Sequence, residues 1–426
     1  MKTAVIGSGI SGLMAAYVLS RRHEVDVFEK DRRPGGHAHT VDAPGPAGKQ
    51  AVDTGFIVYN ESNYPHFTRL LRELKVETIP SDMSFGVYHP ADAFAYSSRG
   101  LAGLLATPRN AVSPRFYRMV ADIIRFNRLA RGALEDASYA KVTLREFLRM
   151  HAFSEAFERF YITPMSSAIW SAPPGKTLDF PALTFFRFFK NHGLLSLSPD
   201  IPWRTVKGGS RTYVNEMSKP FAHRIHLNAP VRQVRRTAEG VILSFDDGPD
   251  RVYDRVVIAA HADQALRMLA DPSDEERRLL AHFPYQSNRV VLHNDASIMP
   301  RRRAAWASWN VQTSAAGDPT TPLAMSYHMN RLQSIGGPAP YLVTLNPDEA
   351  WLEQLRASTN GRRLYFDTEY EHPAFGTDSF RVQPELVSLN GQRNTCYCGA
   401  WFGYGFHEDG LVSGLNAARA LGVDWS

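Results

Sequence analysis

The sequence contains little cysteine, and this excludes several kinds of site. Only two cysteines occur in 426 residues, Cys396 and Cys398. A single C-x-C pair supplies too few ligands for a structural zinc site and spans too little chain for a stabilising disulfide. The fifteen histidines show no convincing metal-ligand spacing. We therefore expect no metal site and two buried, idle thiols.

Long apolar runs are also missing. No stretch approaches the roughly 18 residues that a membrane-spanning helix needs. A glycine loop stands near the N-terminus, where a signal peptide would place its apolar segment. We therefore expect a cytoplasmic protein. A formal net charge of +5 is modest for this length, so it permits an anionic partner without requiring one, and nothing indicates nucleic acid binding.

Signatures of several common enzyme classes are absent as well. The sequence has no G-x-S-x-G nucleophile elbow, no H-E-x-x-H zinc motif and no phosphate-binding P-loop. It shows no repeats and no low-complexity tracts. With 44% hydrophobic and 21% charged residues, the chain is long enough for two or three folding units with a sizeable core. The chemistry of those classes is therefore not indicated.

What the sequence does contain is a dinucleotide-binding pattern in its first thirty residues. Residues 2–6 are expected to form a strand that breaks at a glycine-rich loop and continues as a helix. In this G-x-G-x-x-G loop, Gly7 permits the tight turn, Gly9 lets the backbone approach a pyrophosphate, and Gly12 allows close helix–strand packing. The helix N-terminus offers N–H groups to the phosphates. Glu29 ends the second expected strand about 20 residues later, where a ribose-binding acid belongs.

A glycine pair just beyond this acid, Gly35 and Gly36, separates the FAD and NAD alternatives. A second close approach of the backbone to a long diphosphate ligand explains such a pair. It resembles the G-G motif of the superfamily of flavin amine oxidases, phytoene desaturases and protoporphyrinogen oxidases. In that superfamily an arginine commonly follows the glycines, whereas this chain has His37. The pattern predicts non-covalently bound FAD.

The resemblance continues over nearly the whole chain. Residues 52–56 resemble the segment beside the flavin ring, residues 230–234 the strand whose backbone meets the adenine, and residues 256–260 a later strand of the same domain. A glycine-rich loop at 397–414 leads into a helix whose N-terminus suits the electron-rich N1/O2 edge of flavin. Many members carry an acid early in this loop, where this chain has Ala400 and Trp401. The cofactor site implied by the motif and the resemblance consists of Gly7, Ser8, Gly9, Ile10, Ser11, Gly12, Glu29, Lys30, Gly35, Gly36, His37, Thr54, Gly55, Phe56, Val231, Ala259, Gly399, Ala400, Phe406, Asp409, Gly410 and Leu411.

Five short segments narrow the resemblance further. They are KGGS at 207–210, SYHMN at 326–330, LNP at 345–347, CGAW at 398–401 and GFHEDG at 405–410. Together they resemble a bacterial group of FAD-binding proteins associated with cyclopropane-fatty-acyl synthase-like methyltransferases. The resemblance implies a modified or unsaturated fatty acyl chain as substrate, desaturation as one plausible reaction, and a lipid methyltransferase as a partner.

The nucleotide-binding pattern is interrupted twice. Helical stretches are expected at 115–134, 144–150 and 182–189, and strand-like runs dominate residues 286–380. We therefore expect an α/β fold in which a Rossmann-type FAD-binding domain is interleaved with an α+β substrate domain made of helices and a mainly antiparallel sheet. The FAD-binding domain is expected at 1–85, 201–270 and 385–426, and the substrate domain at 86–200 and 271–384.

The helix expected at 115–134 is amphipathic and basic. At about 100° per residue, its apolar side carries Phe116, Met119, Val120, Ile123 and Phe126, and its other side carries Arg115, Arg118, Arg125 and Arg128. One interpretation places it on anionic lipid, as a peripheral contact with the inner face of the membrane that suits an acyl substrate. The other is a core-facing helix with a solvated arginine face. Phe185, Phe186, Phe188 and Phe189 fit either an apolar wall for a long chain or ordinary core packing.

Flavin accepts the hydride itself, so the protein must place a substrate C–H over N5, exclude water and handle a proton. His407 and Glu408 lie in the loop that resembles the flavin-contacting segment, and either is a candidate for the proton. Alternatively, Glu408 caps the last helix and His407 makes one backbone hydrogen bond. Amine oxidases commonly hold a lysine near N5, where this chain has Asn288 or Arg289, which argues against ordinary amine oxidation.

Three functions remain open. The leading one is an FAD-dependent oxidoreductase that oxidises or desaturates an acyl lipid. The second is an amine or polyene oxidase of the same superfamily. The third is a non-redox isomerase, or a partner that presents lipid to a methyltransferase and keeps FAD as a structural element. No second G-x-G-x-x-G follows a strand, so we expect no NADPH domain and a flavin reoxidised by oxygen, a quinone or another acceptor.

Overall fold

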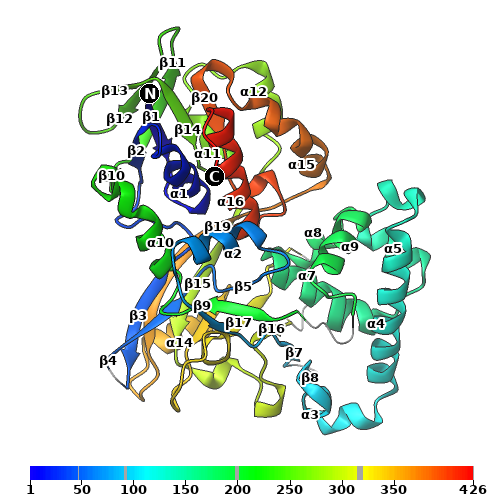
Figure 1. The fold of residues 1–426 in the computed structure, drawn as a ribbon. Helices are drawn as coiled ribbons and strands as arrows, with labels where there is room; N and C mark the ends of the chain where they lie inside the picture. The colour runs from blue at the N-terminus through cyan, green and yellow to red at the C-terminus, as the bar shows by residue number, and fades with distance from the viewer. Residues whose placement is uncertain (47, 91–93, 197–200, 314–319, 426) are drawn as a thin grey trace.

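Five parallel strands form the sheet at the top of Figure 1, where the N-terminal strand lies. The computed structural model describes residues 1–46, 48–90, 94–196, 201–313 and 320–425. In sheet order the strands are β10 (Ile225–His226), β2 (Glu24–Phe28), β1 (Lys2–Ile6), β14 (Arg255–Ile258) and β20 (Thr395–Tyr397). Four of the five residues of β1 are buried, as expected for a strand with neighbours on both sides. The strand predicted at 2–6 is confirmed.

Helices cover this sheet, and two of them approach each other closely. These are α1 (Ile10–Leu19), which follows the first glycine loop, and α16 (His407–Ala420) near the C-terminus. A Cβ added to Gly414 would lie 2.1 Å from the carbonyl oxygen of Ser11, so the close contact requires glycine there. The same half of the molecule contains α2 (Pro65–Glu73), α10 (Arg211–Ser218), α11 (Ala262–Met268), α12 (Asp274–Leu280), α15 (Thr377–Val382) and an antiparallel sheet of β11 (Val231–Arg236), β12 (Val241–Phe245) and β13 (Arg251–Tyr253).

A seven-stranded sheet forms the core of the other half. In sheet order its strands are β19 (Leu364–Pro373), β15 (Tyr285–His293), β18 (Leu342–Leu345), β17 (Ala324–His328), β16 (Trp309–Gln312), β7 (Phe85–His89) and β8 (Phe94–Ser97). Every neighbouring pair is antiparallel except β16 and β7. Two short helices, α13 (Met329–Leu332) and α14 (Glu349–Arg356), connect its strands. Together with the parallel sheet, this confirms the predicted α/β class with a mainly antiparallel second sheet.

Asp53 joins the segments that pass between the two large sheets. It ends β4 (Gly48–Asp53), which forms a hairpin with β3 (Thr40–Gly45). Its buried carboxylate accepts hydrogen bonds from Thr40 Oγ1 at 2.6 Å, from Ser210 N at 2.9 Å and from Gln333 Nε2 at 2.9 Å. Burial raises the pKa of Asp53 to about 6. The K-G-G-S segment at 207–210 thus contacts the buried carboxylate of Asp53 through Ser210. It follows a small sheet made of β5 (Val58–Asn60), β9 (Trp203–Val206) and β6 (Thr78–Pro80).

A helical lobe stands beside the seven-stranded sheet, at the right of Figure 1. It consists of α3 (Gly100–Leu104), α4 (Pro114–Ala133), α5 (Leu144–Met150), α6 (Glu155–Phe157), α7 (Thr163–Trp170), α8 (Pro174–Thr177) and α9 (Ala182–Asn191). The helices predicted at 115–134, 144–150 and 182–189 are confirmed. The apolar side of α4 packs into the protein, with Phe116, Met119 and Phe126 buried, so the core-facing interpretation of that side is correct. No helix in the described part of the chain is long and apolar enough to cross a membrane.

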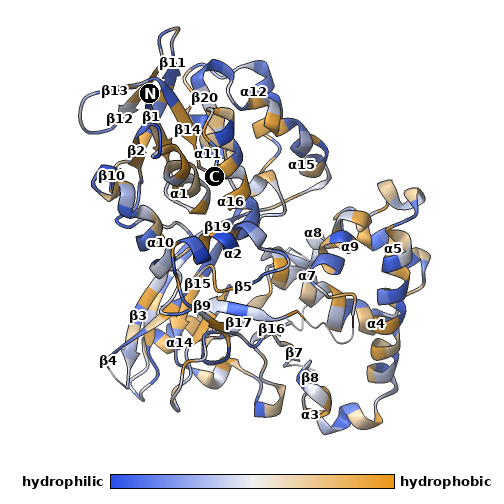
Figure 2. Ribbon diagram, in the orientation of Figure 1, coloured by the Kyte–Doolittle hydropathy of each residue, from blue (hydrophilic) through white to orange (hydrophobic). Residues whose placement is uncertain are grey.

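Hydrophobic residues concentrate in the strands of the two large sheets and on the inner sides of their helices (Figure 2). Cys396 and Cys398 are free and buried in β20 and just beyond it, as the sequence predicted. Burial raises the pKa of the Cys396 thiol to about 11, so it stays protonated and unreactive at neutral pH. No cluster of three potential metal-ligating side chains occurs among the described residues.

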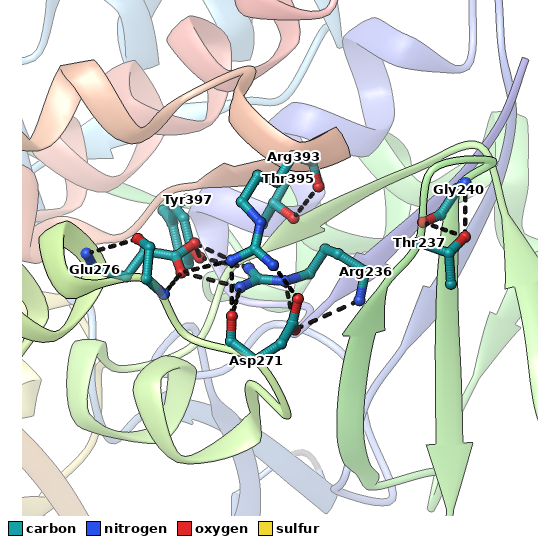
Figure 3. Close-up of polar contacts among 9 residues, drawn as sticks. Arg236, Thr237, Gly240, Asp271, Glu276, Arg393, Thr395 and Tyr397 are labelled. Atoms are coloured by element: carbon teal, nitrogen blue, oxygen red, sulfur yellow. Dashed lines mark hydrogen bonds and ion pairs between the residues drawn. The ribbon is translucent and has the colours of Figure 1, made fainter.

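A buried ion-pair network ties the antiparallel sheet to the parallel one (Figure 3). Arg236 on β11 donates two side-chain hydrogen bonds of 2.9 Å to Glu276 on α12, and two of 2.8 Å to the carboxylate and the backbone carbonyl of Asp271. Tyr397 on β20 donates to the same glutamate at 2.6 Å, and Arg393 pairs with Asp271. Burial alone would raise the pKa of Glu276, but these hydrogen bonds and the arginine charge lower it to about 2. The network therefore holds three separate chain segments together through charged groups.

Candidate flavin and substrate cavity

A cavity of about 1340 Å³ lies between the two large sheets. Its wall contains residues that follow β1 and β2, residues 366–373 of β19, and side chains from α7 and α9. A volume of this size is large enough for a dinucleotide together with a second molecule.

The first glycine loop leaves room for a ligand at one position and none at the others. Gly7 has a φ of +99°, and a Cβ added there would lie 2.5 Å from the carbonyl oxygen of Ala259. At Gly12 the added Cβ would lie 2.0 Å from the carbonyl oxygen of Gly7. At Gly9 it would meet no protein atom within 4 Å, although Gly36 stands against the same turn from the other side. The loop therefore offers its backbone to the cavity at Gly9, as a pyrophosphate site requires.

Glu29 lies at the end of β2, at the cavity wall. Its carboxylate accepts hydrogen bonds from Ser8 N at 2.9 Å, Ser8 Oγ at 2.5 Å and Asp31 N at 3.0 Å. These contacts fix the acid against the glycine loop. A carboxylate held there is an acceptor for the hydroxyl groups of a ribose, so the residues present fit a dinucleotide.

Most of the predicted cofactor residues lie in the cavity wall. Besides Gly7, Gly9, Glu29 and Gly36, the wall contains Ser8, Ile10, Ser11, Lys30, Gly35, His37, Thr54, Gly55, Phe56, Val231, Ala259, Gly399, Ala400 and Phe406. The N-terminus of α16 also lies there, through Gly405, Phe406 and His407. The positive end of the fourteen-residue helix α16 thus lies at the cavity, as the resemblance to the flavin-binding superfamily implied.

Four predicted cofactor residues lie behind the wall and shape it. Gly12 and Gly410 permit close packing, because a Cβ added to Gly410 would lie 2.9 Å from the side chain of Ile10. Leu411 is buried in the core. Asp409 accepts hydrogen bonds of 2.9 Å from the backbone N–H groups of Tyr404 and Phe406. These four residues position the loop that carries the helix N-terminus and do not line the cavity themselves.

His407 forms part of an aromatic wall. Its ring stacks on Phe56, with centroids 3.7 Å apart and planes 9° apart. Its Nε2 atom shares a 2.8 Å hydrogen bond with the Tyr213 hydroxyl. The partner is a side chain, so the alternative expectation of a backbone hydrogen bond is wrong. Burial lowers the pKa of His407 to about 3, so the ring is neutral at physiological pH. Its place in the wall suits contact with a flat ring better than transfer of a proton.

Glu408 points away from the cavity. It accepts hydrogen bonds from His66 N at 2.9 Å, His66 Nδ1 at 2.8 Å and Phe67 N at 3.0 Å. These are the first N–H groups of α2, which have no partner inside the helix. Glu408 therefore caps α2, not α16 as the alternative expectation had it, and all of its contacts are structural. Its predicted role in proton handling is not supported by this position.

Asn288 on β15 lies one layer behind the cavity and contacts a residue that sequence reasoning missed. Its Nδ2 donates to Nδ1 of His372 at 2.9 Å, and its Oδ1 accepts from Nδ2 of Asn346 at 2.8 Å. Asn288 is fully buried, whereas His372 lines the cavity. Because an amide N–H group must donate, Nδ1 of the neutral imidazole is the acceptor and Nε2 carries the proton. Asn288, predicted as a catalytic residue, thus contacts His372 of the cavity wall and does not line the cavity itself.

His372 belongs to a polar section of the wall. The rings of His37 and His372 lie 5.2 Å apart, and Tyr370 lies 4.9 Å from His37. The Tyr370 hydroxyl contacts His39 Nδ1 at 2.8 Å and Thr54 Oγ1 at 2.9 Å. Burial lowers the pKa of His37 to about 4 and that of His372 to about 3. Nε2 of His37 is buried and has no hydrogen-bond partner within the described ranges.

A pattern in the sequence of β19 indicates this polar section of the cavity wall. Along β19 the residues alternate between acids and a second set, Phe366, Thr368, Tyr370 and His372. In a strand such alternation places the second set on one face. These four residues line the cavity together with the acids between them, so the period-two pattern would have identified a strand of the wall but not which of its faces meets the cavity.

The far end of the cavity is apolar and uncharged. Figure 1 places α7, α9, β7 and β16 away from β1 and its glycine loop. The lining contributed by these four elements and the residues next to them carries no acidic or basic charge: it contains Met83, Ser84, Phe85, Met165, Ile169, Trp170, Ser171, Phe188, His192, Leu194 and Trp309. The acids of the wall, Glu29, Asp31, Asp367, Glu369 and Glu371, follow β2 or lie on β19. Burial lowers the pKa of His192 to about 4, so this histidine is neutral as well. Of the four phenylalanines of α9, Phe188 lines the cavity, and Phe185, Phe186 and Phe189 pack in the core.

Known proteins resemble this chain in sequence and in fold. A Mycobacterium tuberculosis protein named as a flavin-containing monoamine oxidase, AofH, is 27% identical over 313 residues, covering 65% of this chain and 61% of that protein. The chloroplastic protoporphyrinogen oxidase of Oryza sativa subsp. japonica is 26% identical over 194 residues, covering 40% of this chain and 31% of the rice protein. The chain thus spans about three fifths or less of the length of these relatives.

The fold comparison covers almost the entire chain. The crystal structure of a fatty acid isomerase from P. acnes, described as producing CLA, superposes with a TM-score of 0.67 at 16% identity, covering 98% of both chains. At this identity the likeness concerns the fold alone. The sequence model of the family described as flavin containing amine oxidoreductase matches residues 10–351, most of the chain. The chain is therefore a member of the flavin-containing amine oxidoreductase family.

Proposed function

We propose that this oxidoreductase oxidises or desaturates a long acyl chain, such as that of an unsaturated or methylated fatty acid. The observation that carries the proposal is the uncharged, aromatic far end of the cavity. An acyl chain buries apolar surface there at a gain of roughly 25 cal/mol per Å². The resemblance to proteins associated with fatty-acyl methyltransferases supports the same substrate class, and such a methyltransferase would supply it.

An amine fits this end less well. A protonated amine needs an acceptor or a carboxylate when it leaves water, and the far-end lining contributes neither Asp nor Glu. Asn288 or Arg289 is expected where amine oxidases commonly hold a lysine, and the Asn288 amide is engaged with His372 and Asn346. These two observations favour an acyl substrate over amine oxidation.

The chain contributes binding, exclusion of water and proton handling. FAD, when bound, supplies the hydride acceptor. The glycine loops and Glu29 would hold its nucleotide half, and the aromatic far end would keep water from the reacting carbons. Loss of a hydride from one carbon must be matched by loss of a proton from its neighbour when a double bond forms. We assign that proton to His37, whose Nε2 is buried and unpartnered among the described residues, because Nδ1 of the neighbouring His372 is engaged by Asn288 and its Nε2 already carries a proton.

Anaerobic mixing of the FAD-loaded protein with candidate substrates tests this proposal. Phospholipids with unsaturated or methylated acyl chains should bleach the oxidised-flavin band. Primary amines and a carotenoid, added at the same concentrations, should leave it unchanged. Bleaching by amines or by the carotenoid alone would favour the amine or polyene oxidase instead. Conversion of lipid without bleaching and without a change of mass would favour an isomerase, as named for the structural neighbour from P. acnes.

A further inference from the structure

Positive charge is concentrated in residues 99–150, which form the outer part of the helical lobe. This segment contains ten arginines and lysines but four acidic residues, a net charge of +6. The whole chain has a formal net charge of +5. The rest of the protein is therefore nearly neutral, and the basic character of the molecule belongs to this one segment.

The same segment exposes large apolar side chains. Nine large hydrophobic residues are exposed in the described part of the chain, and five of them lie here. Their exposed fractions are 71% for Leu101, 81% for Val112, 54% for Tyr117, 49% for Ile124 and 62% for Met150. Single exposed hydrophobic residues are ordinary, but a group confined to one small part of the surface indicates an interaction site.

Hydrogen bonds connect the parts of the chain that carry these side chains. Tyr117 on α4 donates to the carbonyl of Ala111, next to Val112, at 2.8 Å. Asn110 donates to the carbonyl of Leu104 at the end of α3, at 3.2 Å. Arg125 on α4 donates to the carbonyl of His151, next to Met150, at 2.7 Å. Leu101, Val112, Tyr117, Ile124 and Met150, with the arginines around them, therefore belong to one connected part of the lobe, which we call the basic apolar face.

The outer side of α4 forms the centre of this face. Tyr117, Ala121, Ile124, Arg128 and Arg131 are all exposed and recur at intervals of four and three residues. Such spacing places them in one line along the helix. Hydrophobic and hydrophilic residues alternate along α4 at the right of Figure 2. The apolar side that the sequence offered to lipid is buried, so any membrane contact must use this opposite, arginine-bearing side.

The basic apolar face is connected to the substrate end of the large cavity. Beneath the start of α4, Phe94, Phe116 and Phe160 pack in one apolar cluster, and Phe85 packs against the same cluster. Phe85 also lines the large cavity. A smaller cavity of about 180 Å³ is lined by Phe94, Phe116 and Phe160 together with Arg109 and Arg115. Phe85 thus contacts both the apolar cluster beneath the start of α4 and the large cavity.

We propose that the basic apolar face docks on the surface of an anionic phospholipid bilayer. Arginines near such a surface are attracted by its negative potential, and exposed leucine, valine, isoleucine and tyrosine side chains insert among the lipid head groups. The net charge of +6 and the five exposed apolar residues occur together only in this segment of the described chain. Docking there brings the cavity toward a supply of acyl chains, but the proposal does not depend on the flavin reaction.

Co-sedimentation of the FAD-loaded protein with vesicles tests the proposal. Vesicles of phosphatidylglycerol and phosphatidylcholine in equal parts should sediment the protein, and phosphatidylcholine vesicles should not. The double variant Arg128→Glu/Arg131→Glu should reduce partitioning about tenfold or more, and so should Val112→Ser/Ile124→Ser. The control Arg22→Glu/Arg235→Glu changes the net charge equally at two exposed sites outside the face and should stay within twofold of the natural protein.

Three outcomes would overturn the proposal. They are equal partitioning on neutral vesicles, an equal loss in the control variant, and self-association without lipid that Val112→Ser/Ile124→Ser abolishes. The last result would make the face an interface between two copies of the chain. Circular dichroism of each variant checks that the helices remain folded. Flavin reduction by detergent-dispersed substrate should be unchanged in all variants, which separates this test from that of the proposed function.

Discussion

At the scale of single residues, the glycines of the first glycine loop have different roles. A Cβ at Gly12 would collide with the backbone of Gly7, whereas a Cβ at Gly9 would enter open space that the cofactor is expected to fill. Gly12 is thus needed for the fold, and Gly9 for the ligand. The motif in the sequence could not separate these roles, because the spacing is the same for both.

This difference gives a matched pair of variants. Gly9→Ala should fold with a melting temperature close to that of the natural apoprotein, yet bind FAD at least about tenfold more weakly, because its Cβ occupies the pyrophosphate position. Gly12→Ala should be destabilised even without FAD, because packing space is missing. Thermal unfolding of the apoproteins and FAD titration measure the two effects. Equal behaviour of both variants would contradict the assignment.

His372 is the second point at this scale. Replacing it with Ala removes the ring beside the proposed proton acceptor His37 and should slow flavin reduction by up to about 10²-fold, the lower range for lost proton handling, while FAD binding is retained. Above pH 4 the natural protein should show no titration of this group, since its pKa of about 3 leaves the ring neutral. Asn288→Asp should place a carboxylate beside Nδ1, raise the pKa of His372 and introduce a pH dependence, whereas Asn288→Leu should introduce none. A flat pH profile in Asn288→Asp would argue against the contact.

At the scale of helices and strands, charged groups satisfy helix ends and join segments. Glu408 caps α2 from the first turn of α16, and Asp409 holds the loop before α16. Glu408→Ala should therefore lower the free energy of unfolding by about 1 kcal/mol, the usual cost of a lost cap. The rate of flavin reduction and its pH profile should not change. Urea unfolding and stopped-flow kinetics check the two statements, and a lost basic limb in the pH profile would restore Glu408 as a proton-handling group.

The Arg236 network makes a prediction about acid stability. Glu276 has a pKa of about 2 in the folded protein, below its ordinary value of 4.5. A carboxylate whose pKa is depressed by folding stabilises the protein above its unfolded pKa, and this contribution is lost as the pH falls from about 4.5 to about 2. Arg236→Met should leave the buried carboxylate unpaired, cost about 3–5 kcal/mol and weaken this pH dependence. Urea midpoints at pH 3, 5 and 7 measure both, and an unchanged midpoint at pH 7 would contradict the role of the network.

At the scale of the whole molecule, the two sheets enclose the cavity because the chain passes between them several times. The sequence predicted the parallel sheet well, since buried parallel strands and a glycine loop leave local signals in residues 2–29. It predicted FAD and most of the cavity wall near the nucleotide for the same reason. The domain boundaries drawn from the sequence remain a prediction.

Contacts between distant segments could not be read in this way. Glu408 meets His66 across 342 positions, and Asn288 meets His372 across 84. No local pattern encodes either partner, because each is set by how the two halves pack. The apolar side of α4 illustrates the same limit: its periodicity was correct, but only the packed structure shows that this side faces the core.

The central claim is that the cavity joins an FAD site to an uncharged end that holds an acyl chain, and that oxidation follows. Mass spectrometry of lipids from cells with and without the protein tests it most directly. We predict acyl species two hydrogens lighter in the presence of the protein, absent when Gly9→Ala replaces it. Identical acyl masses in both sets of cells, with the FAD-loaded protein present, would contradict the account.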